Sequence, residues 1–110
     1  MFPIWEFCKF TTDMRIIAKK TLIDFWEMNK DAEQPLKAWY HEAKIAAWTK
    51  PSDIKKLYAD ASILKNSRVI FDIAGNKYRL VVAIRYEFKI IYIRFIGTHK
   101  QYDKIDANTI

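Results

Sequence analysis

The sequence has few of the residues that form covalent or metal-bound scaffolds. Its 110 residues include one cysteine, Cys8, and two histidines, His41 and His99. A single cysteine cannot form a disulfide within the chain, and these three residues do not make a spaced set of zinc ligands. A disulfide scaffold and a zinc module are therefore excluded, and we expect no metal and no cofactor.

Glycine and proline are also scarce, with 2 and 3 residues, while 51% of the residues are hydrophobic. This composition excludes collagen-like repeats, low complexity and disorder, and it predicts a packed globular domain. No apolar run approaches the roughly 18 to 20 residues that span a bilayer. The first ten residues also lack the basic region and cleavage site of a signal peptide. We therefore expect a cytoplasmic protein with no membrane partner.

Positive charge is in excess, since 19 Lys and Arg stand against 13 Asp and Glu, for a net charge of +6. Such a surface favours a polyanionic partner, and nucleic acid is favoured over a membrane surface. Residues 1–13 differ from the rest because they are crowded with aromatic and large apolar side chains and carry a net negative charge. They are predicted to be an N-terminal extension, either an added strand or tail packed on the body or a leader from an upstream start codon. Residues 14–110 are predicted to form the single domain.

Residues 15–66 are predicted to be mostly helical. A short apolar strand at Arg15–Ala18 precedes Thr21 and Asp24, whose spacing suits a capping box for a helix over Leu22–Asn29. Pro35 suits the first position of a second helix that ends before Pro51. Ser52 suits the N-cap of a third. The predicted apolar positions of these two helices share one face in each: Leu36, Trp39, Tyr40, Ala43 and Ala47, then Ile54, Leu57, Tyr58 and Ala61.

After Asn66 the hydrophobic period changes to two, which predicts strands at Arg68–Ile73, Lys77–Tyr86 and Lys89–Gly97. A two-residue turn at Gly75-Asn76 would pair Ile73 with Tyr78, Phe71 with Leu80 and Val69 with Val82. A turn at Glu87-Phe88 would pair Ile84 with Ile91, Val82 with Ile93 and Leu80 with Phe95. The predicted fold class is α+β. It consists of a small antiparallel sheet, made of a three-strand C-terminal meander and the short N-terminal strand, with helices packed on one face.

Four of the chain's five arginines fall on the opposite face of this predicted sheet. Arginine can donate two hydrogen bonds to one phosphate, and tyrosine can stack on a base, so this face could hold RNA. Two plainer alternatives stay open: Asp72 and Arg79 could form an ordinary cross-strand ion pair, and Arg85 could simply be solvated. The full predicted face is Arg68, Ile70, Asp72, Arg79, Val81, Arg85, Tyr92, Arg94 and Ile96.

A short helix is predicted just after the last strand, because Thr98 and Gln101 have capping-box spacing. It would bring His99 and Tyr102 beside the arginines. A lone histidine is more often a surface or packing residue than a catalytic one, and His41 is read as a helix-surface residue. However, metal-free RNA cleavage needs proton transfer and stabilisation of phosphorane charge, which a histidine with several arginines can supply.

Three segments together resemble the HigB toxins of type II toxin-antitoxin systems, a branch of the RelE-like mRNA interferases. They are WTKPSDI at residues 48–54, RVIFDIAGNKYRLV at residues 68–81 and GTHKQYD at residues 97–103, within a similarity that runs from about Met14 to Asp106. The resemblance implies a RelE-like fold and a metal-independent endoribonuclease that cuts translated mRNA in the ribosomal A site. It also implies a HigA-type antitoxin as partner, with operator DNA bound only through the toxin-antitoxin complex.

Within the matching segments, the expected catalytic residues are His99, as general acid or base, with Arg94 and Arg79. Expected RNA contacts are Arg68, Lys77, Arg85, Tyr92 and Tyr102. Two other functions stay open. The first is a basic RNA- or ribosome-binding module that blocks translation without cleavage, and the second is a structural partner domain whose arginines are paired at a protein interface.

Overall fold

The computed structural model describes residues 14–110, which form an α+β fold. The predicted extension at residues 1–13 lies outside the described residues. The elements in chain order are β1 (Arg15–Ile17), α2 (Lys19–Met28), the 3-10 helix η1 (Lys30–Ala32), α3 (Glu33–Ala46), α4 (Pro51–Leu57), β2 (Ser62–Ile63), β3 (Arg68–Ile73), β4 (Tyr78–Arg85), the 3-10 helix η2 (Tyr86–Phe88), β5 (Ile90–Thr98) and α5 (His99–Tyr102). None of these helices is long and apolar enough to cross a membrane.

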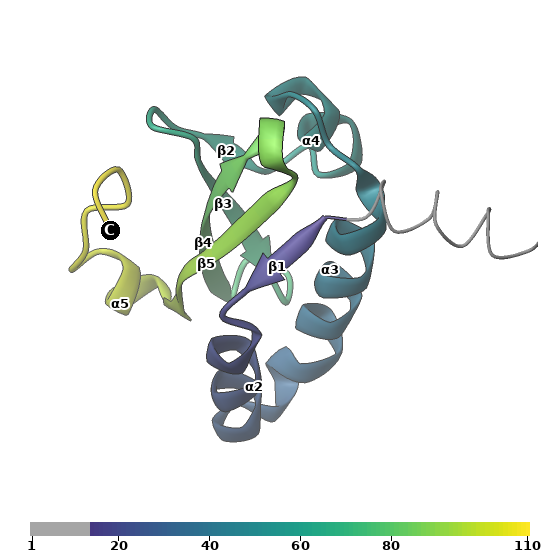
Figure 1. The fold of residues 1–110 in the computed structure, drawn as a ribbon. Helices are drawn as coiled ribbons and strands as arrows, with labels where there is room; N and C mark the ends of the chain where they lie inside the picture. The colour runs from purple at the N-terminus through teal and green to yellow at the C-terminus, as the bar shows by residue number, and fades with distance from the viewer. Residues whose placement is uncertain (1–13) are drawn as a thin grey trace, which may run out of the picture.

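The strands form one five-stranded sheet in the order β1-β5-β4-β3-β2 (Figure 1). The antiparallel meander β3-β4-β5 was predicted correctly, but the sheet as a whole is mixed because β1 runs parallel to β5. Hydrogen bonds from Met14 N to Lys44 O at 2.7 Å and from Arg15 N to Lys89 O at 2.8 Å fix the entry of β1. The strand β2 was not predicted, because its two exposed residues are too few to show a period.

The turn between β3 and β4 follows the prediction. Gly75 and Asn76 have φ of 62° and 79°, and Lys77 N donates to Ala74 O at 3.3 Å across them. All three predicted pairs of the β3-β4 hairpin are present. At the second turn, Lys89 has φ of 56° and its N–H bonds to Tyr86 O. This turn gives the predicted pairs of Ile84 with Ile91 and of Val82 with Ile93.

The third predicted pair of that hairpin is wrong, because Leu80 pairs with Ile96 and not with Phe95. The register shifts between Val81, which faces Phe95, and Val82, so that Arg94 is the unpaired extra residue of a β-bulge. Beyond the bulge the two faces of β5 are exchanged. Ile96 therefore packs in the helix-covered core, whereas Phe95 packs on the opposite face.

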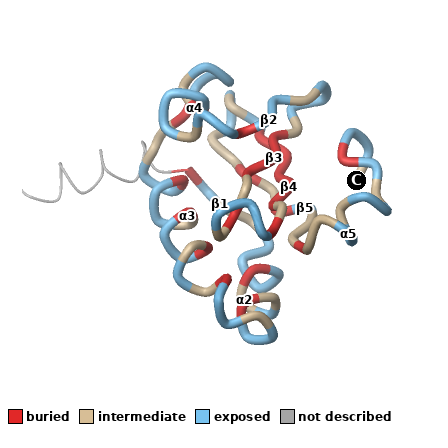
Figure 2. The backbone as a smooth tube through the Cα atoms, turned by 180° about the vertical axis from the view of Figure 1, so that it is seen from behind, coloured by how far each residue is buried: buried red, intermediate tan, exposed pale blue. Residues whose placement is uncertain are grey.

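The three longer helices cover one face of the sheet and enclose the main core (Figure 1). Figure 2 shows the buried positions along the central strands and on the sides of α2 and α3 that face them. Trp39 of α3 meets Phe71 of β3 edge-on, with ring centroids 5.4 Å apart. The fully buried side chains at this interface include Leu22, Leu36, Trp39, Ile54, Val69, Phe71, Leu80, Val82, Ile84 and Ile91.

The opposite face is not the open basic surface that alternation predicted. Its central residues, Ile70 and Val81, are buried under the C-terminal segment, residues 103–110, where Ala107 is also buried. This segment and α5 lie across the sheet from α3, in yellow in Figure 1. An apolar contact therefore separates the arginines of this face from one another. The alternation of side chains along the strands could not predict this contact, because the covering segment has no hydrophobic period of its own.

The predicted helix starts need correction. Ala18, with φ of 76°, precedes α2, so Thr21 and Asp24 lie inside the helix and make no capping box. Asp24 instead accepts a hydrogen bond from Lys20 at 3.0 Å. Pro35 is the third residue of α3 rather than the first, because η1 leads directly into that helix.

Lys50 is the N-cap of α4 and Pro51 takes its first position, so the N-cap prediction for Ser52 is wrong. Asp53 stabilises this turn by accepting hydrogen bonds from Thr49 N at 3.1 Å and Thr49 Oγ1 at 2.9 Å. These bonds hold the pKa of the Asp53 carboxyl below its usual value. The helix ends at Leu57, which is exposed rather than buried as predicted.

Candidate active site

Three of the predicted site residues meet where β4 begins and β5 ends. Arg79 pairs with Gly97 across the two strands, and His99 follows Gly97 by two residues at the start of α5. The Arg79 Nε atom consequently lies 3.3 Å from His99 Nε2. Tyr102, one turn further along α5, has its ring centroid 5.2 Å from the Arg79 guanidinium carbon.

The predicted capping box holds His99 in place. Thr98 Oγ1 accepts from Gln101 N at 3.2 Å, and the Gln101 side chain accepts from Thr98 N at 2.9 Å. Gly97 leaves room for this arrangement, since a Cβ atom there would lie 2.5 Å from Gln101 Oε1 and 2.7 Å from Phe95 Cζ. The imidazole is therefore fixed by local backbone structure on a helix of only four residues.

The hairpin tip sets the tautomer of His99. Its Nε2 atom lies 2.7 Å from the main-chain oxygen of Asn76. A carbonyl oxygen can only accept, so Nε2 carries the hydrogen, and the 3.3 Å approach of Arg79 Nε is a close contact rather than a second donation to it. Nδ1 makes no hydrogen bond to any described residue, so it is the nitrogen available to take or give a proton.

The Arg79 guanidinium is in contact with Asp72 through its inner nitrogen, Nε, while its two terminal nitrogens have no hydrogen bond to the described residues. Its Nε lies 3.3 Å from Asp72 Oδ1, and both side chains are 25% exposed. The alternative of a cross-strand ion pair between Asp72 and Arg79 is confirmed, and this ion pair coexists with the contact of Arg79 to His99. No hydrogen bond joins the two terminal nitrogens of Arg79 to the described residues, so they can still donate to a phosphate.

Arg94 and Tyr92 form a second group on β5. The Arg94 guanidinium carbon lies 5.9 Å from the Tyr92 ring centroid, and Arg94 is exposed at the bulge. Within residues 14–110, no hydrogen bond, ion pair or ring contact joins either side chain to the cluster of Arg79, His99 and Tyr102. The prediction that these residues share one continuous surface is therefore met only in part.

The remaining predicted contacts lie elsewhere. Lys77 forms an ion pair with Asp31 of η1, which raises the pKa of Lys77. Arg68 donates from its guanidinium to the main-chain oxygen of Ile110. Arg85 is exposed at the far end of β4, six positions and roughly 20 Å along the strand from Arg79.

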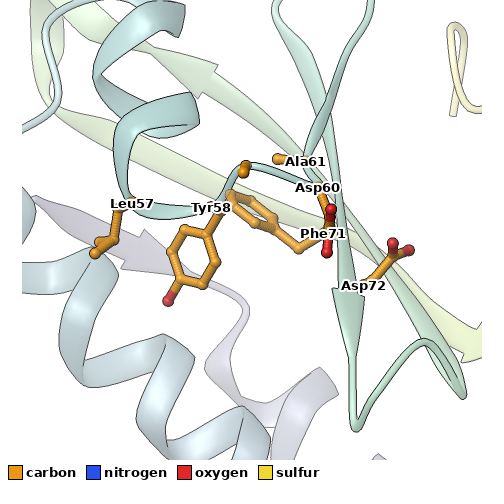
Figure 3. Close-up of a pocket in the computed structure, with 7 residues that line it drawn as sticks. Leu57, Tyr58, Asp60, Ala61, Phe71 and Asp72 are labelled. Carbon is orange, nitrogen blue, oxygen red and sulfur yellow. The ribbon is translucent and has the colours of Figure 1, made fainter.

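A pocket of about 200 Å³ lies beside Asp72, the ion-pair partner of Arg79 (Figure 3). The loop after α4 contributes most of its wall, and a neighbouring hollow is lined by Asp60, Asp72, Gly75 and Asn76. Burial and a hydrogen bond to Glu42 raise the pKa of Tyr58, so its phenol stays neutral. This pocket was not predicted, because hydrophobic periodicity does not show where a loop meets a strand edge. The pocket is lined by Leu57, Tyr58, Ala59, Asp60, Ala61, Phe71 and Asp72.

Comparison with known proteins now identifies the family. The model of the HigB_toxin family, described as the RelE-like toxic component of a toxin-antitoxin system, matches residues 32–105. The chain belongs to the HigB toxin family. The predicted resemblance is thus confirmed, and the match spans every candidate residue from Arg68 to Tyr102.

Two relatives of this HigB-family chain have the same degree of similarity. The mRNA interferase toxin HigB of Escherichia coli K12 is 28% identical over 96 residues, which cover 86% of this chain and 92% of the relative. The mRNA interferase HigB of Shigella flexneri gives the same values. As the toxic component of a toxin-antitoxin system, a HigB-family chain implies an antitoxin partner.

Proposed function

We propose that this HigB-family toxin is an mRNA endonuclease whose active site is the cluster of Arg79, His99 and Tyr102. The observation that carries the proposal is the arrangement of His99 beside the guanidinium of Arg79. The Nε2–H of His99 is fixed by the Asn76 carbonyl, and its Nδ1 has no hydrogen-bond partner among residues 14–110. The names of the relatives, which are mRNA interferases, support the same activity.

The chemistry follows from these groups. The 2′-oxygen attacks the adjacent phosphorus as its hydroxyl proton leaves, and the bond from phosphorus to the 5′-oxygen breaks as that oxygen gains a proton. The products are a 2′,3′-cyclic phosphate and a 5′-hydroxyl. His99 Nδ1 takes part in one of the two proton transfers. The terminal nitrogens of Arg79 donate hydrogen bonds to the phosphorane oxygens as their negative charge increases. These steps need no metal ion.

The RNA contacts extend outward from this cluster. Tyr102 lies against Arg79, where it can position a base, and Tyr92 with Arg94 offers a second stacking and phosphate-binding group on β5. Arg85 remains a candidate contact at the far end of β4. Arg68 and Lys77 are weaker candidates, because each must first release the partner it holds in the free protein, Ile110 or Asp31.

We further propose that cleavage requires a translating ribosome in the cytoplasm, that the antitoxin is of the HigA type, and that operator DNA is bound only by the toxin-antitoxin complex. The net charge of +6 supports association with ribosomal RNA.

The test is to map the 5′ ends of mRNA after purified protein is added to a translating cell-free system, with a ribosome-free reaction beside it. Cuts within translated codons that require ribosomes and disappear with His99→Ala and Arg79→Ala are expected. If translation stops while every transcript stays whole, the protein is a non-catalytic ribosome-binding module and the endonuclease proposal fails.

A further inference from the structure

The carboxylate of Asp72 lies at the centre of the contacts that orient both proposed catalytic side chains. It forms an ion pair with Arg79, whose Nε lies 3.3 Å from Oδ1, and the tip of the β3-β4 hairpin lies on its other side. We propose that Asp72 is a positioning residue of the active site, fixing the guanidinium of Arg79 directly and His99 through Asn76. This inference rests on the proposed endonuclease function.

The contact with Arg79 decides which way the guanidinium points. Asp72 binds Nε, the inner nitrogen, while the ring of Tyr102 lies beside the group 5.2 Å away. With these two contacts in place, the terminal nitrogens make no hydrogen bond within residues 14–110 and can meet a phosphate together. A free arginine side chain samples many rotamers, so removing the acceptor would cost this orientation before any substrate binds.

The contact with the hairpin tip reaches His99. Ala74, Gly75 and Asn76 all have positive φ, from 57° to 79°, so the turn needs support from its side chains. With its amide nitrogen turned toward Asp72, Asn76 donates to the two carboxylate oxygens at 3.2 and 3.3 Å, whereas the opposite orientation would place oxygen against oxygen. The main-chain oxygen of the same Asn76 receives the Nε2–H of His99 at 2.7 Å. Asp72 thus stabilises the residue that sets the His99 tautomer.

The negative charge of Asp72 has the opposite effect on substrate, because it lies beside the position of an RNA phosphate and repels it. Two substitutions of Asp72 can therefore separate its positioning of the catalytic side chains from its repulsion of the phosphate. Asp72→Asn keeps a side-chain oxygen of the same length beside Arg79 Nε and removes the charge. Asp72→Ala removes both.

The experiment measures single-turnover cleavage of a ribosome-bound mRNA over a range of toxin concentrations, for the wild type and both variants. For Asp72→Ala the maximal rate is expected to fall about 10- to 100-fold. For Asp72→Asn the maximal rate is expected to stay within about threefold of the wild type. The toxin concentration that gives half of the maximal rate is expected to decrease by about threefold, because the repulsion between Asp72 and the phosphate is removed. Asp24→Ala removes one negative charge from an exposed ion pair on α2 and should match the wild type.

Two results would overturn the inference: an Asp72→Ala rate equal to the wild type, or equal losses in Asp72→Ala and Asp72→Asn. NMR gives a readout that does not depend on cleavage. In Asp72→Ala the Arg79 Nε–H should exchange faster with water, and the His99 ring should lose its preference for the Nε2–H tautomer. If the wild type cleaves no mRNA, the proposed function fails by itself, and unchanged NMR signals in Asp72→Ala would then overturn the positioning role as well.

Discussion

Arg68, the first residue of β3, donates two hydrogen bonds from its guanidinium to the main-chain oxygen of Ile110, at 3.2 and 2.8 Å. A third bond joins it to Asn66 O at 2.9 Å. The guanidinium thus ties the C-terminal segment to the sheet, over Ile70 and Val81. In the free protein this arginine supports the segment that follows α5, which carries Tyr102.

Arg68→Ala is expected to loosen that segment. The loss of two charge-assisted hydrogen bonds should lower the free energy of unfolding by about 1–3 kcal/mol, and the amides of residues 103–110 should exchange hydrogen faster. Urea denaturation and hydrogen exchange measure the two effects. Arg85→Ala is the matched control, because the Arg85 side chain is exposed and makes no hydrogen bond or ion pair with the described residues. Equal exchange rates in Arg68→Ala and the wild type would show that this contact does not hold the segment.

The two histidines give a direct test of the active site. His99→Ala should reduce mRNA cleavage by about 10²- to 10⁴-fold, because a positioned proton-transfer group is lost, and it should leave the fold and antitoxin binding intact. His41→Ala, on the exposed side of α3, should leave cleavage at the wild-type rate. Cleavage rates in the translating cell-free system, with circular dichroism for folding, provide the comparison. Equal activity of the two variants would remove His99 from the mechanism.

The parts of this structure that the sequence could predict are those with a local cause. The Gly75-Asn76 turn fixes the β3-β4 register because those residues tolerate positive φ, and the Thr98 capping box follows from side chains three positions apart. The bulge at Arg94 has no such signal. One extra residue exchanges the faces of Phe95 and Ile96, and alternation alone cannot show where it is inserted.

The candidate site was predictable to the same extent. His99 and Arg79 converge because the strand register places Gly97 opposite Arg79. The second turn alone predicts Ile96 at that position, so the pairing of Arg79 with Gly97 depends on the bulge, whereas the capping box at Thr98 was predictable. The C-terminal cover over Ile70 depends on contacts about 40 positions apart in sequence, which no local pattern encodes. The roles of the Asn76 carbonyl and of the pocket beside Asp72 likewise appear only in three dimensions.

The two glycines of the chain should respond differently to alanine. At Gly97 the added Cβ would lie 2.5 Å from Gln101 Oε1, so the capping box that holds His99 must open. We expect Gly97→Ala to lower stability by about 1–3 kcal/mol and also to reduce cleavage. Gly75→Ala meets no atom within 4 Å and has only the strain of its φ of 62°, which costs roughly 1 kcal/mol. Urea midpoints and cleavage rates of both variants test this, and full activity of Gly97→Ala would contradict it.

Stability at acid pH should depend on Asp31, which links η1 to the β3-β4 hairpin. Hydrogen bonds from Lys77 and from the Tyr78 hydroxyl, the latter 2.7 Å long, lower the pKa of the Asp31 carboxyl below its ordinary 3.8. A carboxyl with a lowered pKa stabilises the folded state fully above the unfolded value and loses that contribution as pH falls through the folded value. Asp31→Asn should therefore be less stable than the wild type near neutral pH. The difference in free energy of unfolding between the wild type and Asp31→Asn should shrink as pH falls below 3.8.

Urea midpoints of both proteins from about pH 6 down to about pH 2 measure this difference. Asp24→Asn, in an exposed helix ion pair, is the control, and a gap for Asp31→Asn that is constant with pH would show that the ionised carboxylate does not stabilise the fold.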